Sequence, residues 1–181
     1  LRAHDILEAA DGTAAGIQVA VEIREDAIAV DFVGTDAARP GVPSAVSAVT
    51  RACLEFAVRS VLPGDVPRNG GVSRLLALKT PAGSVVDARA PMPVGVGNVE
   101  ASQRIADVLL TALAPAFPDR IGAASQGTMN NLLIGSVPGS NRPFVYYETI
   151  GGGQGGRPGK PGQSGLHTGM TNTANTPVEA L

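Results

Sequence analysis

The chain has 181 residues, of which 44% are hydrophobic, so it is long enough to bury a sizeable core as one ordinary domain or two small ones. Its 14 basic and 16 acidic residues leave a formal net charge of −2, which excludes the broad basic surface of a nucleic-acid-binding protein. The longest apolar runs, such as 108–113, fall far short of the roughly 20 residues that span a bilayer. We therefore expect a soluble protein with neither nucleic acid nor a membrane as its partner.

Cysteine, glycine and proline usage narrows the class further. The single cysteine, Cys53, excludes an internal disulfide and suits a reducing compartment, so we expect a cytoplasmic protein. Ten of the fifteen residues in 151–165 are Gly or Pro. Because glycine loses the most backbone entropy on ordering, we predict that this segment is a mobile loop that covers or abuts a site.

Alternating apolar residues predict a β-hairpin near the N-terminus, with strands at 17–24 and 27–32. Apolar residues at helical spacing then predict a helix over 44–62. Ser44 is placed to cap the start of this helix, and Pro63 is placed to end it.

The later part of the chain continues to mix strands with helices. The remaining expected elements are, in chain order, strands at 75–79 and 84–88, a helix over 99–114 capped by Asn98, and a strand pair at 131–137 and 143–150. Strands and helices alternate without the regular period of a doubly wound sheet. We therefore predict the α+β class.

Two apparent nucleotide motifs lack the context that they need. Residues 151–156 formally contain GxGxxG, but a Pro- and Gly-rich loop follows where that fingerprint requires a helix. Gly159-Lys160 is not a phosphate-binding loop, because Pro161 stands where the hydroxyl residue would be. Metal ligation is also poorly supported, since His4 and His167 are the only histidines and neither has a partner at chelating spacing. We expect no metal site and no cofactor within this chain.

Three runs are dense in polar side chains: 98–104, 125–131 and 167–173. The first run could belong to a binding site, but a solvated helix face with Glu100 and Arg104 one turn apart also explains it. The second is explained equally by the tight turns that Asn and Gly favour. For the third, the alternative is that His167 only pins the loop by a backbone hydrogen bond.

Taken together, these runs resemble the hydantoinase B/oxoprolinase family. The strings that carry the resemblance are, in chain order, Val30 to Asp36, Gly97 to Arg104, Ala124 to Leu132, Tyr146 to Gly153 and His167 to Glu179. Two positions depart from the usual pattern: Ala101 stands where relatives often have Thr, and Gly169 stands where they often have a second His. The resemblance implies that residues 1–181 are an internal fragment, the middle to later part, of a larger B-type subunit.

The resemblance implies a division of labour in opening hydantoin or 5-oxoproline rings. A partner A-type subunit would use ATP and Mg²⁺ to phosphorylate the amide oxygen, and the B-type part would complete hydrolysis with a divalent metal. The His and Asp ligands of that metal belong to the N-terminal half of the subunit, which is missing here and would be a second partner. We therefore expect the fragment alone to be inactive.

The site residues follow from the same strings. The resemblance points to His167, Glu148 and Asn130 as catalytic groups, and to a substrate-binding set of Asn98, Glu100, Arg104, Ser125, Asn131 and Asn172. Two other functions stay open: a subunit of an ATP-dependent acetone or acetophenone carboxylase, and a non-catalytic scaffold. An enzyme predicts that the catalytic residues converge on a cleft, whereas a scaffold predicts that they scatter.

Overall fold

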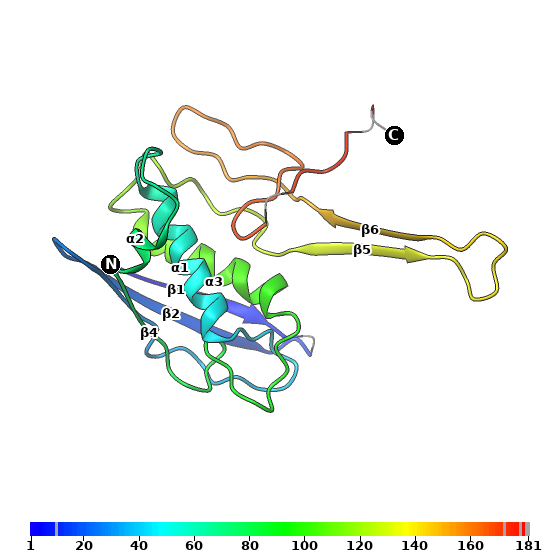
Figure 1. The fold of residues 1–181 in the computed structure, drawn as a ribbon, viewed down its shortest axis with the longest axis horizontal. Coiled ribbons are helices and arrows are strands. Elements are labelled where there is room, and N and C mark those ends of the chain that lie inside the picture. Colours follow the sequence, from blue (N-terminus) through cyan, green and yellow to red (C-terminus); the bar gives the residue numbers. More distant parts are fainter. Residues whose placement is uncertain (10, 172, 178, 180–181) are drawn as a thin grey trace.

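The computed structural model describes residues 1–9, 11–171, 173–177 and 179. The elements are, in chain order, β1 (Arg2–Glu8), β2 (Ala14–Ile23), β3 (Ile28–Asp31), α1 (Ser47–Val61), α2 (Gly70–Ser73), β4 (Leu76–Lys79), the π-helical turn η1 (Gly97–Ala101), α3 (Ser102–Leu113), β5 (Asn130–Gly135) and β6 (Val145–Ile150). They form a four-stranded sheet with helices beside it and a separate two-stranded hairpin (Figure 1). This mixture confirms the predicted α+β class.

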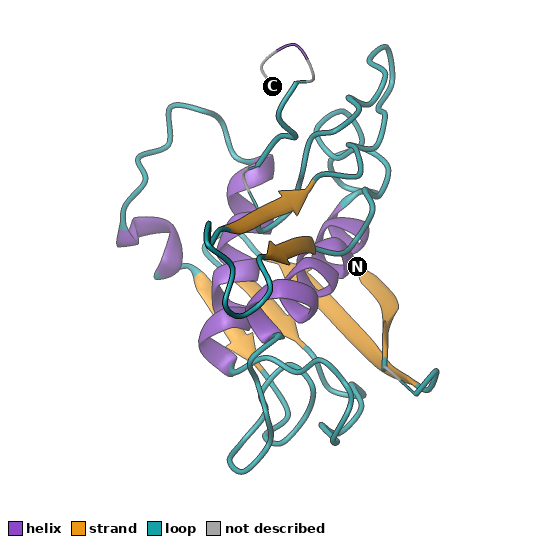
Figure 2. Cartoon of the chain, turned by 90° about the vertical axis from the view of Figure 1, so that its right-hand side faces the viewer, coloured by secondary structure: helices purple, strands orange, loops and turns teal. Residues whose placement is uncertain are grey.

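The four-stranded sheet has the order β1-β2-β3-β4 and is antiparallel except between β3 and β4. Along β2, Ile17, Val19 and Val21 are buried while Gln18 is exposed. Because side chains alternate across a strand, the buried residues share one face. Helix α3 packs against β1 and β2, and α1 packs beside α3 (Figure 2).

The interface between α1 and α3 is apolar. On α3, Ile105, Leu109 and Leu113 recur every fourth residue and are fully buried, as an amphipathic helix requires. Cys53 of α1 faces them, and its thiol donates to the carbonyl of Ser102 at 3.4 Å. Burial raises the pKa of this thiol to about 12, so Cys53 serves as a small apolar side chain. No helix in the described residues is long and apolar enough to cross a membrane.

Both helix predictions are confirmed within a few residues, but the two predicted N-caps are wrong. Helix α1 begins after Val46, and the Ser44 hydroxyl instead donates to the carbonyl of Val42 at 3.2 Å. Asn98 lies inside η1, which runs into α3 without a break. A capping side chain needs a free helix N-terminus, and position 98 does not offer one.

The strand predictions are confirmed for the hairpin of β2 and β3, for β4 and for the pair of β5 and β6. The strand predicted at 84–88 is wrong, because Val85 and Val86 are both buried in consecutive turns, whereas a strand would send them to opposite faces. Strand β1 was missed. It is an edge strand whose outer residues are exposed, so its sequence reads as a polar lead-in.

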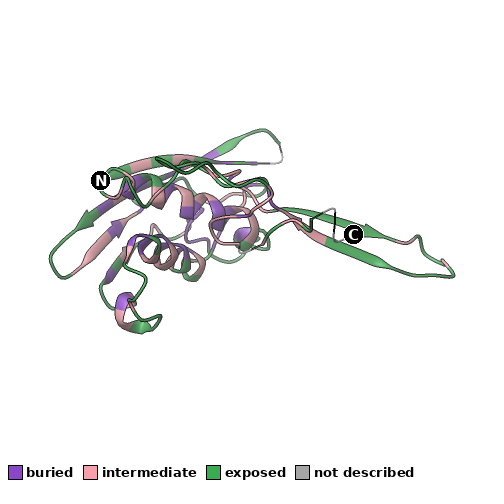
Figure 3. Ribbon diagram, turned by 90° about the horizontal axis from the view of Figure 1, so that it is seen from above, coloured by how far each residue is buried: buried purple, intermediate pink, exposed green. Residues whose placement is uncertain are grey.

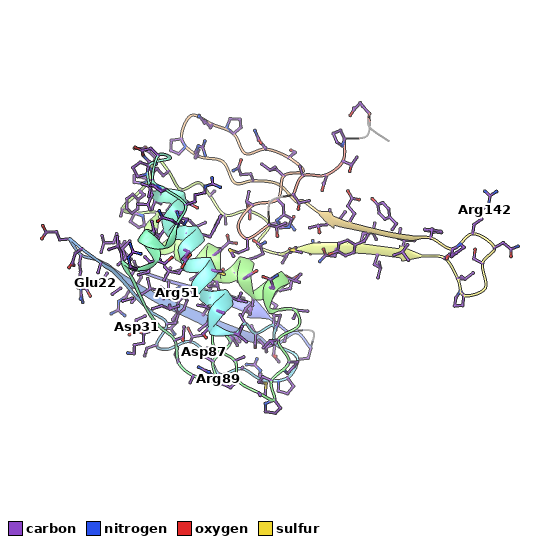
Figure 4. All side chains as sticks on the ribbon, viewed as in Figure 1. Glu22, Asp31, Arg51, Asp87, Arg89 and Arg142 are labelled. Atoms are coloured by element: carbon purple, nitrogen blue, oxygen red, sulfur yellow. The ribbon has the colours of Figure 1, made fainter. Side chains whose placement is uncertain are left out.

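Strands β5 and β6 form an arm that extends away from the helices (Figure 1), with Arg142 in the loop at its far end (Figure 4). Strand β5 is exposed throughout, and β6 is exposed at 145–147 and half-buried at 148–150, near the root (Figure 3). Even large apolar side chains lie open on it: Leu133 is 67% exposed and Val145 is 77% exposed. Its root, where β5 begins and β6 ends, returns to the body of the molecule.

Candidate functional site

Among the described residues after β6, His167 is the most buried polar one, with 6% of its surface exposed. Its backbone N–H donates to the carbonyl of Thr173 at 2.7 Å. The ring nitrogen Nδ1 lies 3.2 Å from the carbonyl of Thr168, and Nε2 is buried with no hydrogen-bond partner among the described residues. A ring whose Nδ1–H donates to Thr168 leaves Nε2 as a free proton acceptor.

Helix α3 braces the segment that follows His167. The Gln103 amide nitrogen donates to the Thr171 hydroxyl at 2.8 Å, and its oxygen accepts from the Met170 backbone N–H at 3.2 Å. Gln103 is only 2% exposed, and both bonds are partly buried. The Thr171 hydroxyl also contacts the sulfur of Met129 at 3.0 Å, which ties this segment to the root of the arm.

Asn175 closes the base of the glycine-rich loop. Its side-chain oxygen accepts from the Gly151 backbone N–H at 2.6 Å, and its side-chain nitrogen donates to the Gly151 carbonyl at 3.0 Å. Its own backbone N–H donates to the carbonyl of Gly165 at 2.8 Å. One residue therefore holds both ends of the loop together, next to His167.

Gln103 and Asn175 were missed as site residues by sequence reasoning. Both lie inside strings that carried the family resemblance, 97–104 and 167–179, and that membership was the available signal. Their partners are 67 or 68 residues away for Gln103 and 24 away for the side chain of Asn175. Spacing along the chain cannot reveal contacts of this range.

Glu100 lies on η1 near His167. Burial raises the pKa of its carboxyl, against the lowering influence of the Met129 backbone N–H, of Arg104 and of His167. Arg104 is committed elsewhere, since its guanidinium bonds to the Asp5 carboxylate at 3.2 Å and donates to the Ile6 carbonyl at 3.2 Å. Glu100 thus lies within electrostatic range of His167, whereas Arg104 ties α3 to β1.

The three predicted site residues on the arm occupy its two faces. Asn130 pairs with Ile150, and Glu148 pairs with Leu132, so Asn130 and Glu148 are diagonal neighbours on one face. The Glu148 carboxylate accepts from the Tyr146 hydroxyl, and this hydrogen bond raises the pKa of Tyr146.

Asn131 points to the other face of the arm. Its side-chain oxygen accepts from the Tyr147 hydroxyl at 2.6 Å and from the Thr149 hydroxyl at 2.9 Å. These bonds span the two strands and stabilise the arm near its root.

The other predicted substrate-binding residues lie apart. Asn98 is exposed on η1, where its carbonyl accepts from the Ser102 hydroxyl at 3.2 Å. Ser125 lines a cavity of about 400 Å³ that Asp107 also borders. Asn172 lies outside the described residues. The structure therefore gathers Glu100, His167 and the root of the arm in one place, with the cavity flanking the segment after His167.

No three His, Cys, Asp or Glu side chains gather into a metal-binding group in the part of the chain that the structure describes. The divalent metal that the resemblance implies thus finds no ligand set among these residues. What the described site offers is proton transfer by a buried imidazole and hydrogen bonding by amide and carboxylate groups.

Comparison with known proteins identifies the family. The family model described as Hydantoinase B/oxoprolinase matches residues 1–181, the whole chain. The chain belongs to the Hydantoinase B/oxoprolinase family. The predicted resemblance is confirmed.

Similar proteins come from distant organisms. The uncharacterized protein MJ0963 of Methanocaldococcus jannaschii is 47% identical over 91% of this chain and 28% of its own length. The 5-oxoprolinase 1 of Arabidopsis thaliana is 37% identical over 93% of this chain and 12% of its own length. The 5-oxoprolinase of Saccharomyces cerevisiae is 33% identical over 80% of this chain and 11% of its own length.

A crystal structure of an ATP-dependent caprolactamase from Pseudomonas jessenii shares the fold. Its TM-score is 0.74 at 22% sequence identity, over 99% of this chain and 32% of the caprolactamase chain. This chain therefore spans less than a third of each of these relatives.

Proposed function

We propose that this chain is part of the B-type subunit of a cytoplasmic, ATP-dependent enzyme that hydrolyses small cyclic amides of the hydantoin or 5-oxoproline type. Membership of the Hydantoinase B/oxoprolinase family and similarity to 5-oxoprolinases support the reaction class. Within the chain, one observation carries the proposal: buried His167 keeps Nε2 without a partner among the described residues, at the root of the arm.

His167 moves protons in this proposal. Hydrolysis forms a bond from the water oxygen to the carbonyl carbon and breaks the bond from that carbon to the ring nitrogen. The attacking water must lose a proton, and the departing nitrogen must gain one. An imidazole nitrogen can both accept and donate a proton, so Nε2 can accept the first proton and return it to the nitrogen. Glu100 lies within electrostatic range of the ring.

Asn130 and Glu148 orient the substrate. A cyclic amide presents one carbonyl acceptor and one N–H donor, and the two side chains share a face of the arm. The Asn130 amide donates to the carbonyl, and the Glu148 carboxylate accepts from the ring N–H. Asn98, Ser125 and Asn172 supply further polar contacts in the proposal, whereas Arg104 acts by tying α3 to β1 and Asn131 acts by bonding across the two strands of the arm.

The remaining chemistry is assigned to other parts of the assembly. ATP and Mg²⁺ belong to the A-type partner subunit, and the divalent metal belongs to a part of the B-type subunit outside this chain. Activating the amide oxygen by phosphorylation answers the poor reactivity of an amide carbonyl. This chain contributes proton transfer and substrate orientation.

The test is an assay of the intact complex with ATP. The substrates are hydantoin, 5-oxoproline, caprolactam, and a ketone with bicarbonate. Ring-opened product formed together with ADP supports the proposal. If the ketone is the only compound that reacts and bicarbonate is consumed with it, the enzyme is a carboxylase instead. Turnover of none of these compounds leaves the scaffold.

A further inference from the structure

A cavity of about 400 Å³ lies next to the segment that follows His167. Its volume falls in the range of small-molecule sites, roughly 300–1,000 Å³. Helices α1 and α3 supply an apolar wall of Phe56, Leu110 and Ala114. Another wall comes from the glycine-rich loop and from residues 120–125. The polar side chains of the lining that concern a ligand are Asp107 and Thr111 on α3, and Arg120, Ser125, Arg157 and Thr168 outside the helices.

The wall formed by the glycine-rich loop is held by backbone contacts. The Ala123 N–H donates to the carbonyl of Gly156 at 2.8 Å. A Cβ at Gly155 would meet the Ala123 carbonyl, so only glycine allows this close approach. The cavity wall is therefore set by the packing of 122–124 against 155–156, which leaves the Arg157 side chain to border the space.

Asp107 provides an unsatisfied carboxylate on the helical side of the cavity. Its side chain forms no hydrogen bond with any described residue, and Oδ2 is buried. Burial raises the pKa of Asp107 to about 6, with Arg104 lowering it and Asp5 raising it. Since Arg104 is bonded to Asp5 and to the Ile6 carbonyl, Asp107 lacks a donor of its own. A buried carboxylate of this kind favours a cationic or N–H ligand group.

The other end of the cavity is basic. A neighbouring hollow shares Ser60, Arg120 and Arg157 with the cavity and adds Lys160 and Asp119. Three cationic side chains, Arg120, Arg157 and Lys160, thus lie at this end with one carboxylate, that of Asp119. Arg120 donates to the carbonyl of Leu62 at 3.1 Å, and none of the three cations forms an ion pair among the described residues. A carboxylate ligand group would find its counter-charge there.

We infer that this cavity binds a zwitterionic amino acid, the ring-opened product, with its ammonium group on Asp107 and its carboxylate on Arg120 and Arg157. The inference rests on the lactam case of the proposed function, because hydrolysis of a lactam such as 5-oxoproline gives one molecule that carries both an amine and a carboxylate. The apolar wall of Phe56, Leu110 and Ala114 matches the methylene chain between them.

The experiment is calorimetric titration of the complete subunit without ATP. The probes are 6-aminohexanoate and L-glutamate, the ring-opened forms of caprolactam and 5-oxoproline. Butylamine and butyrate serve as ligands with only one charged end. We expect one zwitterion to bind at least about tenfold more tightly than either one-ended ligand, since each charge-assisted contact is worth a factor of this size.

Two variants probe the two ends separately. Asp107→Asn and Arg157→Ala are each expected to weaken zwitterion binding at least about tenfold, while butyrate is affected only by Arg157→Ala and butylamine only by Asp107→Asn. Asp65→Asn is the matched control, because Asp65 is exposed and borders neither hollow. If Asp107→Asn perturbs the fold, Arg157 in the exposed loop still tests the site.

The pH dependence provides an independent readout. Binding of the ammonium group should weaken as pH falls through about 6, where Asp107 gains a proton. The charged groups that act on Asp107 are Arg104 of α3 and Asp5 of β1. In Asp107→Asn this pH dependence should disappear.

The outcomes separate this inference from the proposed function. Equal binding by wild type and both variants, with ring opening intact, overturns the inference and leaves the function standing. If zwitterion binding depends on Asp107 but no cyclic amide is turned over, the inferred site stands and the proposed function is overturned. L-alanine, which none of the tested substrates yields, must bind more weakly. Equal binding of L-alanine would show a general amino acid sensor and would overturn the product assignment.

Discussion

His167 and Asp107 each bury one polar atom without a hydrogen-bond partner among the described residues. An unpaired buried polar group costs about 1–3 kcal/mol, which a fold selected for stability alone would avoid. The two are linked in space, because Thr168, the neighbour of His167, borders the same cavity as Asp107. At the scale of single residues, these two atoms are the strongest indications that the region binds a ligand.

Replacing His167 by Ala in the complete complex is expected to lower kcat by at least about a hundredfold, the usual size of a lost acid-base group. His4→Ala is the matched control, because His4 is exposed on β1 and should leave kcat unchanged. Steady-state kinetics and thermal melting provide the measurements. A drop of only a few-fold, or a loss of the fold, would mean that His167 merely pins the loop.

The Asp107 carboxyl makes stability depend on pH. Its pKa in the folded protein is about 6, above the usual value of 3.8, so the folded state holds the proton more tightly than the unfolded state. Folding stability should therefore fall as pH rises from about 4 to about 6. Asp107→Asn removes this loss and should raise the free energy of unfolding at pH 7 by about 1–2 kcal/mol, with little effect at pH 4. Denaturant titrations at both pH values test this, and an equal change at both would contradict it.

Individual site residues were predictable only where the residue type itself indicated a chemical role. His167 is one of two histidines, so its type alone drew attention to it. Gln103 and Asn175 are ordinary amides whose importance comes from where their partners lie in the fold. Arg104 shows the converse, because its spacing favoured Glu100 as a partner and the fold supplied Asp5 instead.

At the scale of elements, the helices and hairpins were predictable because their apolar period repeats over several turns or residue pairs. Strand β1 and the turns at 84–88 were not. The burial of β1 alternates, but Asp5 lies on its more buried side and Ile6 on its exposed side, so the sequence does not alternate in polarity. At 84–88, two consecutive buried valines resemble a strand although the chain turns there. The predictions of the two helix caps failed for a related reason, since the capping residue is set by where the helical backbone begins.

The glycine-rich loop has a packing role that composition did not reveal. Glycines at 151, 155 and 162 come so close to neighbouring backbone that a Cβ would overlap a carbonyl oxygen. Backbone hydrogen bonds also join its two sides, with the Gln154 N–H donating to the Gln163 carbonyl at 2.8 Å. The predicted mobility of 151–165 stays a prediction, but these contacts explain the glycines by close approach as well.

Gly155→Ala tests the packing of this loop. The added methyl group would meet the Ala123 carbonyl, so the variant should lose about 1–3 kcal/mol of stability or open the loop locally. Gly64→Ala is the control, because nothing lies within 4 Å of its Cβ position and its backbone needs no positive φ. Thermal unfolding and hydrogen exchange over 122–124 and 151–165 would show the effect. Equal behaviour of the two variants would mean that the loop is not packed as described.

At the scale of the whole molecule, the arm of β5 and β6 differs from the rest because its large apolar side chains are exposed. A two-stranded hairpin is marginally stable in water unless a third strand or a packed surface supports it. Here Leu133 and Tyr147 pair on one face and Ile134 and Tyr146 on the other, and all four are exposed. Apolar side chains on both faces of an arm are typical of a segment that other polypeptide covers.

The last prediction concerns this chain by itself. Residues 1–181 are expected to bind ligands through the cavity but to open no cyclic amide when supplied with ATP. The chain spans 32% of the caprolactamase with the same fold, and its described residues form neither a metal-binding group nor a phosphate-binding loop. Proton transfer by His167 then acts on an amide that nothing has activated, and an amide carbonyl reacts slowly with water. The measurement is release of ADP and ring-opened product by purified residues 1–181, beside the intact complex at equal concentration. Turnover by the short chain that His167→Ala abolishes would show that the whole reaction resides in these residues, and would remove the need for a partner subunit.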